Sequence, residues 1–192
     1  MKQISLGMVQ YAQDYDETMV PNATAVPTYL SPDGTVINIP PQGAMLWMYL
    51  IYPYVKNVQI FRCPSYIDNW SPTVYDGSCG YGKNTWLGGV SLAQIDDPVS
   101  TVQVDDCNYY LADWDVWADP DAPVSASDNA QEPRDGHNQG ANFGFCDGHA
   151  KWLAAGKAGW TDGADHNPPT GMAPAGTDYW SPNKASPISR SY

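Results

Sequence analysis

Two histidines and two carboxylates lie close together in the last third of the sequence. His137 is followed, after nine intervening residues, by Asp147-Gly148 and then by His149, and Asp135 comes shortly before His137. Imidazole and carboxylate groups are suitable ligands for zinc or iron. The alternative is a structural role, in which the imidazole of His137 hydrogen-bonds loop backbone around a β-hairpin. We favour the structural role, because nothing in the sequence brings His137 to the face that carries His149.

A second set of candidate residues lies in the acidic segment 105–135. Its carboxylates are Asp105, Asp106, Asp113, Asp115, Asp119, Asp121, Asp128, Glu132 and Asp135. Carboxylates on an irregular loop can chelate calcium, although no EF-hand pattern is present. Calcium is therefore the one cofactor that this composition indicates. Its candidate ligands are Asp113, Asp115, Asp119 and Asp121. The alternative is an acidic loop that is only solvated.

The same segment has the residue types of a carbohydrate site. Two carboxyl groups at a suitable separation can cleave a glycosidic bond, and aromatic rings can stack on sugar faces. The candidate acids are Asp105, Asp106, Asp113, Asp115 and Asp135, and the candidate stacking rings are Trp86, Trp114 and Trp117. Other catalytic templates are missing, since the chain has no GxSxG, P-loop, HExxH, or GxGxxG after a strand. We therefore lean against an enzyme, with a glycoside hydrolase as the alternative.

Asp147-Gly148 predicts the turn of a β-hairpin. Asp-Gly is typical of a two-residue type I′ turn, in which both residues have positive φ. Such a turn pairs Phe145 with Ala150 and Phe143 with Trp152, and it places these four side chains on one face. Cys146 and His149 are then expected together on the other face.

Hydrophobic periodicity predicts the remaining elements. An amphipathic helix is indicated by Ile4, Met8, Tyr11, Ala12 and Tyr15. A second helix is expected over residues 44–52, ended by Pro53. Strands are expected at 58–61, 101–106, 142–146 and 149–153. A loop is expected at 21–41, with a turn at 31–34 between short extended pieces, and an irregular segment at 64–93. We expect one domain over residues 1–156. Residues 157–192 form a tail, rich in Gly, Pro and Asp, that wraps the domain or is flexible.

Four cysteines are an even number without metal-like spacing. In an exported chain the default is two disulfides, and three pairings are possible. Val102 and Val104 should face the core, so Cys107 is expected on the opposite face of its strand. Phe143 and Phe145 should also face the core, which places Cys146 on the opposite face of its own strand. We therefore favour Cys63–Cys79 and Cys107–Cys146, with buried thiols as the alternative.

The order of several motifs resembles that of prepilin-type, type II secretion pseudopilin-like proteins with the H-x9-DG signature. The similar stretches are residues 2–17, 52–57, 60–64, 80–84 and 95–98, followed by His137 and Asp147-Gly148. The resemblance implies an α+β fold, in which an N-terminal helix packs on a small antiparallel sheet with long irregular loops. It also implies a structural role for His137, Asp147 and Gly148.

The resemblance implies that the chain is the head of a pilus-like or secretion pseudopilus subunit, in the extracellular space or the periplasm. Its partners would be other pilin-like subunits, contacted through the N-terminal helix. The alternative is a secreted carbohydrate-active module with polysaccharide as its partner. Family members carry an apolar segment of about 20 residues that anchors them in the inner membrane. We expect this anchor to have been removed just before Met1, the other possibility being a natural soluble relative.

Charge excludes some partners. The net charge of −12 argues against nucleic acid, whose phosphates need basic partners, and against docking on anionic lipid. The longest apolar stretch, residues 44–52, is too short to span a bilayer. An acidic surface suits an exported protein, divalent cations or neutral polymers.

Overall fold

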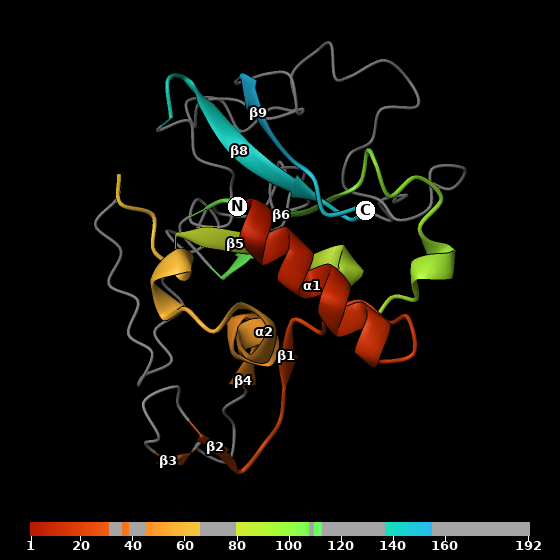
Figure 1. Ribbon diagram of the computed structural model, residues 1–192, viewed down its shortest axis with the longest axis vertical. Coiled ribbons are helices and arrows are strands. Elements are labelled where there is room, and N and C mark those ends of the chain that lie inside the picture. The colour runs from red at the N-terminus through yellow and green to blue at the C-terminus, as the bar shows by residue number, and fades with distance from the viewer. Residues whose placement is uncertain (31–35, 39–44, 66–79, 108–109, 113–136, 155–192) are drawn as a thin grey trace, which may run out of the picture.

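The fold is of the α+β class, as the sequence predicts, and is built on a five-stranded sheet (Figure 1). The computed structural model describes residues 1–30, 36–38, 45–65, 80–107, 110–112 and 137–154. The strands follow the spatial order β7-β5-β6-β8-β9. They are β5 Tyr81–Asn84, β6 Val102–Asp106, β7 Leu111–Ala112, β8 Gly140–Phe145 and β9 Ala150–Ala154. Neighbouring strands are antiparallel, except that β5 and β7 are parallel.

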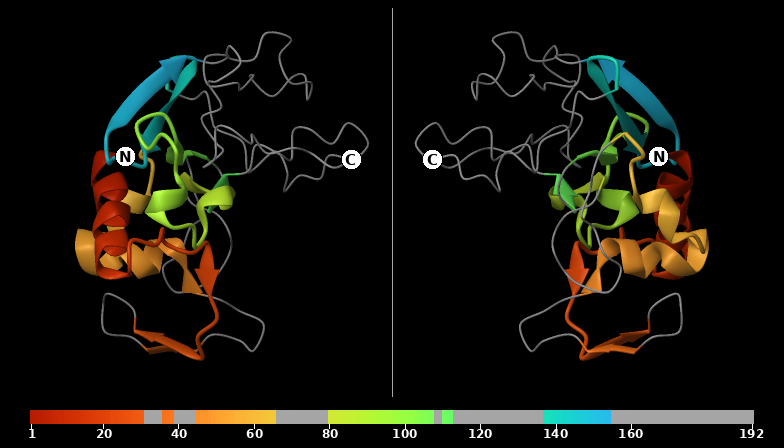
Figure 2. Two further views of the ribbon diagram at one scale, coloured as in Figure 1. Left: turned by 90° about the vertical axis from the view of Figure 1, so that its right-hand side faces the viewer. Right: turned by 90° about the vertical axis from the view of Figure 1, so that its left-hand side faces the viewer.

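Helix α1, Lys2–Asp14, lies on the sheet and beside the second helix. Its buried face includes Ile4, Met8, Tyr11 and Ala12, at the helical spacing that predicts it. It contacts β6 and β8, and Figure 2 shows it alongside α2 with the β8–β9 hairpin near its first turn. Tyr15, predicted for the same face, instead ends the helix and is 54% exposed.

Helix α2, Trp47–Val55, is displaced from its predicted position. It begins three residues later than predicted, and Pro53 lies inside it instead of ending it. Proline removes one helical hydrogen bond, but Trp47, Met48 and Ile51 are buried on this short helix. Burial of such large apolar side chains contributes about 1.5–3 kcal/mol each, so packing outweighs the local preference.

Two small antiparallel pairs lie below the helices in Figure 1. They are β1 Ala23–Thr24 with β4 Met45–Leu46, and β2 Thr28–Leu30 with β3 Val36–Asn38. The predicted turn at 31–34 connects β2 to β3 but lies outside the described residues. The main core gathers side chains from both helices, from β6 and from the segment 58–61, among them Ile4, Met8, Trp47, Ile51, Phe61 and Val104.

Two predictions around the middle of the chain are wrong. The strand predicted at 58–61 is a 3-10 helix, η1 Val58–Phe61, because the Asn57 side chain accepts a hydrogen bond from the Gln59 N–H and starts a turn. The segment 64–93, predicted to be irregular, contains β5 and two further 3-10 helices, η2 Thr85–Leu87 and η3 Leu92–Gln94.

Within the described part of the chain, no helix has both the length and the apolar character that a bilayer crossing requires. The predicted tail, 157–192, lies outside the described residues, so the division into domain and tail stays a prediction.

Candidate functional site

The hairpin forms as predicted, but with another turn and another register. Gly148 N–H donates to the Phe145 carbonyl and Phe145 N–H donates to the His149 carbonyl, which closes a three-residue loop. Gly148 has a φ of 91°, whereas Asp147 is not among the residues with positive φ. A turn followed by a left-handed glycine is the usual three-residue hairpin loop. The predicted type I′ turn is therefore wrong.

The register follows from this loop and is one residue away from the prediction. Phe143 pairs with Lys151 and Asn142 with Trp152. Phe143 and Phe145 are buried as predicted, whereas Trp152 is 44% exposed. A shift by one residue moves side chains to the other face. Trp152 therefore does not share a face with the two phenylalanines, and the His149 ring stacks on Phe145 at 4.3 Å between centroids.

His137 is held in place just before β8 by backbone contacts. Its N–H donates to the Gly140 carbonyl, and its own carbonyl accepts a hydrogen bond of 2.7 Å from the Trp152 indole. Asn138 and Gln139 take left-handed φ values of 59° and 60°. The Trp152 ring packs so closely on Gly140 that a Cβ there would overlap it. The turn and the indole together fix the direction of the imidazole.

The imidazole of His137 contacts two buried side chains. Its Nε2 atom lies 3.3 Å from Cys63 Sγ and 3.5 Å from Asp106 Oδ2. The same Asp106 oxygen accepts hydrogen bonds of 2.7 and 2.8 Å from the backbone and side-chain nitrogens of Asn142. The cluster thus joins the loop after η1, the end of β6 and the start of β8. The predicted hydrogen bond from the His137 ring to loop backbone stays a prediction.

Burial dominates the electrostatics of this cluster. It raises the pKa of Asp106, although the bonds from Asn142 and the charge of His137 act in the opposite direction. The Met1 amine, at the start of α1, lies close enough to the cluster for the charges of Asp106 and Cys63 to raise its pKa. Burial, the largest effect, lowers the pKa of that amine.

The geometry favours a structural clasp over a nucleophilic relay. In a relay, one ring nitrogen takes the proton of the nucleophile while a carboxylate orients the other nitrogen. Here Cys63 and Asp106 both approach Nε2. One nitrogen presents one proton or one lone pair, so the thiol and the carboxylate compete for the same position. These contacts tie three chain segments together.

The second histidine belongs to the other end of the hairpin. Asp147 Oδ1 accepts hydrogen bonds from the backbone and the ring of His149, the latter at 2.6 Å. Burial alone would raise the pKa of Asp147. The hydrogen bonds from His149 and its charge outweigh burial, so the pKa of Asp147 is lowered. β8 separates this pair from His137, and six strand residues span about 20 Å. His137 and His149 therefore cannot bind the same zinc or iron ion, and Asp135, the other carboxylate of this set, lies outside the described residues. Among the described residues, no group of three or more His, Cys, Asp or Glu could hold a metal ion.

Asp105 and Asp106, two candidate acids of the glycosidase alternative, do not form a catalytic pair. They are consecutive in β6, so their side chains point to opposite faces of the sheet. Both are buried. Neither oxygen of Asp105 has a hydrogen-bond partner in another described residue. Burial, and next the charge of Asp106, raise the pKa of Asp105 well above its ordinary value.

The other members of the acidic and aromatic set lie largely outside the described residues. This holds for the calcium and glycosidase candidates Asp113, Asp115, Asp119, Asp121 and Asp135 and for the rings Trp114 and Trp117. Trp86, in η2, is half-buried. The calcium site and the carbohydrate site of this segment stay predictions.

The strand-phase argument for a Cys107–Cys146 disulfide fails. Both residues are buried thiols, and they lie at opposite ends of β6: Cys107 follows the strand, whereas Cys146 N–H bonds the Thr101 carbonyl before it. Cys63 is a third buried thiol, and its predicted partner Cys79 lies outside the described residues.

Sequence reasoning missed a buried lysine. Lys83 in β5 has no exposed surface, and its ammonium donates to Asn22 Oδ1 at 2.7 Å and to the Asn84 carbonyl at 3.1 Å. Burial, which outweighs the charge of Cys146, lowers the pKa of Lys83 to about 7. Lysine is almost never fully buried, so its residue type gave no reason to expect burial. The only signal for Lys83 was its place in 80–84, one of the stretches that carry the resemblance. Cys63 likewise lies in one of the similar stretches, 60–64, but nothing in that stretch indicated a contact with His137.

Comparison of the chain with protein-family models, with curated proteins and with solved structures found no match.

Proposed function

We propose that this protein is the head of a pilus-like or secretion pseudopilus subunit, with a structural role. The observation that carries the proposal is the position of α1, which packs on the sheet with one face and leaves the other exposed. A filament subunit needs such a helix, because its own domain must hold the helix while neighbouring copies contact it. The sequence resemblance supports the same role.

The attachment of α1 to the sheet is specific. Gln103 lies at an irregularity in the pairing of β6 with β8, and its side-chain amide donates both to the Ser5 carbonyl in α1 and to the Phe145 carbonyl in β8. Gly144 in β8 leaves room for Ser5, since a Cβ at Gly144 would overlap the Ser5 hydroxyl. Both contacts are buried. They fix the first turns of α1 to the sheet.

The outer face of α1 suits contact between copies. Helix α1 carries no charged residue between Lys2 and Asp14, although the chain has a net charge of −12. Leu6 on this face is 43% exposed. An uncharged stripe avoids the repulsion that copies of an acidic protein otherwise experience, and an exposed leucine adds apolar surface to a contact.

The proposal is tested in cells that make the protein. Surface appendages are sheared from the cells and probed by immunogold electron microscopy with antibodies against residues 1–154. We expect labelled filaments, or labelled short assemblies at the cell envelope. Label found only on dispersed protein would contradict the proposal.

A polysaccharide-cleaving module is the competing function, and Asp105 and Asp106 give it no support. We expect the purified protein to release no reducing sugar from a polysaccharide panel, with or without calcium. Release that is abolished by a single Asp→Asn change in segment 105–135 would favour the enzyme instead.

A further inference from the structure

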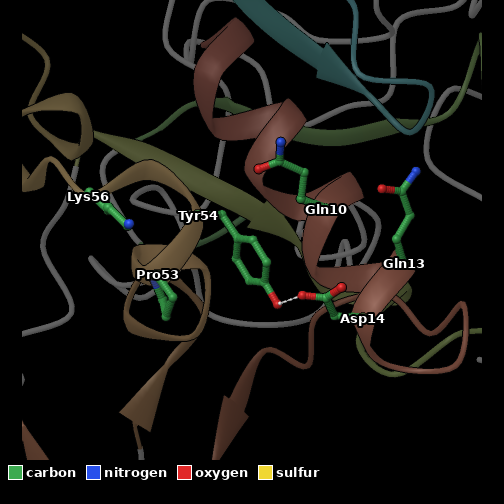
Figure 3. A pocket seen from close by; sticks show the side chains of 6 residues that line it. All are labelled: Gln10, Gln13, Asp14, Pro53, Tyr54 and Lys56. Atoms are coloured by element: carbon green, nitrogen blue, oxygen red, sulfur yellow. Dashed lines mark hydrogen bonds between the residues drawn. The ribbon is translucent and has the colours of Figure 1, made fainter.

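A shallow groove lies between the C-terminal half of α1 and the end of α2 (Figure 3). Its volume is about 470 Å³, within the range of small-molecule sites. Gln10, Gln13 and Asp14 line it from α1, and Pro53, Tyr54 and Lys56 line it from the end of α2. It lies outside the His137 cluster and has no part in the packing of α1 on the sheet.

The lining of the groove is polar and balanced in charge. The lining has one carboxylate, Asp14, one ammonium, Lys56, and the two amides of Gln10 and Gln13. Balance is notable on a chain with a net charge of −12, since neither an anion nor a cation gains a net attraction here. Planar amide and carboxylate groups offer neighbouring donors and acceptors, which match the adjacent hydroxyls of a sugar ring.

An aromatic ring in the groove is held in a fixed position. The Tyr54 hydroxyl donates to Asp14 Oδ2 at 2.9 Å, as the dashed line in Figure 3 shows. Tyr11 packs edge-on against Tyr54 and stacks on Tyr15. Burial first, and then the bond to Asp14, raise the pKa of Tyr54 to about 12, so the hydroxyl keeps its proton at neutral pH. Ring and carboxylate are thus positioned before any ligand binds.

Two residues of the groove oppose the local backbone. Lys56 ends α2 with a φ of 49°, in the left-handed conformation that glycine usually takes at the end of a helix. Pro53 lies in the last turn of the same helix, where it removes a hydrogen bond. Residues kept in unfavourable conformations cluster at ligand sites. Lys56 thus adds an ammonium group to the groove at a position where glycine would fit the backbone better.

We propose that this groove binds a neutral saccharide, such as a sugar unit within a neutral polysaccharide chain. The amides, Asp14 and Lys56 hydrogen-bond the hydroxyls, and the Tyr54 ring contacts the C–H face of the sugar. Binding in so open a groove is weak and involves no bond cleavage. The inference does not depend on the assembly role, because it concerns the purified, unassembled protein.

The test is a titration of the purified protein with cellohexaose, xylohexaose and mannohexaose, followed by amide NMR shifts and calorimetry. At least one of the three is expected to shift signals of the groove residues, with a Kd on the order of 1 mM. Asp14→Ala should abolish the shifts. Lys56→Gly should raise the melting temperature, because glycine relieves the left-handed strain, and yet weaken binding about tenfold or more.

Gln139→Gly is the matched control, since Gln139 also has a left-handed φ, of 60°, and lies beside His137 instead. It should raise the melting temperature and leave saccharide binding unchanged. Absence of binding to all three saccharides would overturn the proposal. So would equal binding of a hexagalacturonate, or unchanged affinity in Lys56→Gly.

Discussion

The Nε2 atom of His137 lies 3.3 Å from the Sγ atom of Cys63, although 74 positions separate the two residues in the chain. The same nitrogen is 3.5 Å from Asp106 Oδ2. One imidazole therefore ties the loop after η1 to the end of β6 and to the start of β8. His137 therefore contributes to the packing of the fold.

Replacing His137 by alanine tests this clasp. His137→Ala removes the shared partner of a buried thiol and a buried carboxylate, so we expect a loss of about 1–3 kcal/mol in the free energy of unfolding, measured in urea. The control is His149→Ala, because the His149 side chain is 38% exposed and its Asp147 partner 33% exposed. That change should cost less than about 1 kcal/mol. Equal losses in the two variants would refute the clasp.

Asp105 should make the protein less stable as the pH rises. Its folded pKa lies well above the ordinary value of 3.8, because burial and the charge of Asp106 disfavour ionisation. Between these two pKa values the folded state binds the proton and the unfolded state does not. Stability then falls by about 1 kcal/mol per pH unit as pH rises above the ordinary pKa. We expect Asp105→Asn to remove this slope in urea unfolding between pH 4 and 7. Parallel pH profiles of variant and wild type would show that Asp105 ionises normally.

Lys83 should have the opposite effect at higher pH. Its folded pKa is lowered from 10.5 to about 7, chiefly by burial. From about pH 7 upward the unfolded state carries a proton that the folded state lacks, so stability rises with pH by about 1 kcal/mol per unit. Lys83→Met should flatten this rise in melts recorded from pH 7 to 9, below the range in which tyrosines ionise. A rise that persists in the variant must come from another group.

Gly148 is the residue of the hairpin loop at which a side chain is most unfavourable. A Cβ there would lie 2.9 Å from Leu6 Cδ2, and the φ of 91° disfavours any other residue. Gly148→Ala should destabilise the protein by about 1–2 kcal/mol. The neighbouring Asp147→Ala should cost less, because it removes only a partly exposed pair with His149. Thermal unfolding of both variants checks the order, and the reverse order would contradict the observed turn.

The elements that could be predicted from sequence are those with a local pattern. Helix α1 shows helical spacing from Ile4 to Ala12. Strand β6 is a short buried segment. The β8–β9 hairpin consists of two short segments on either side of Asp147-Gly148. The register could not be predicted, because Asp-Gly suits both a two-residue loop and the observed three-residue loop. A difference of one loop residue was enough to move Trp152 away from Phe143.

The site was less predictable than the fold. Strand β5 has buried Lys83 and Asn84 where a strand pattern requires apolar residues, so tertiary contacts overrule the local signal. The pairing of His137 with Cys63 depends on how the chain returns to the sheet. No spacing within either segment encodes that contact. His137 itself was found only through its fixed distance from Asp147-Gly148.

The outer face of α1 gives the most direct test of the proposed subunit role. Leu6→Asp should be introduced into the protein as its cells make it, with Val36→Asp as control. Val36 is apolar and 61% exposed but lies on β3, away from α1. We expect Leu6→Asp to reduce strongly the amount of this protein in the sheared appendage fraction. Val36→Asp should leave it at the wild-type amount, and both proteins should stay folded. Equal amounts of the Leu6→Asp and wild-type proteins in that fraction would contradict the proposed contact between copies through α1.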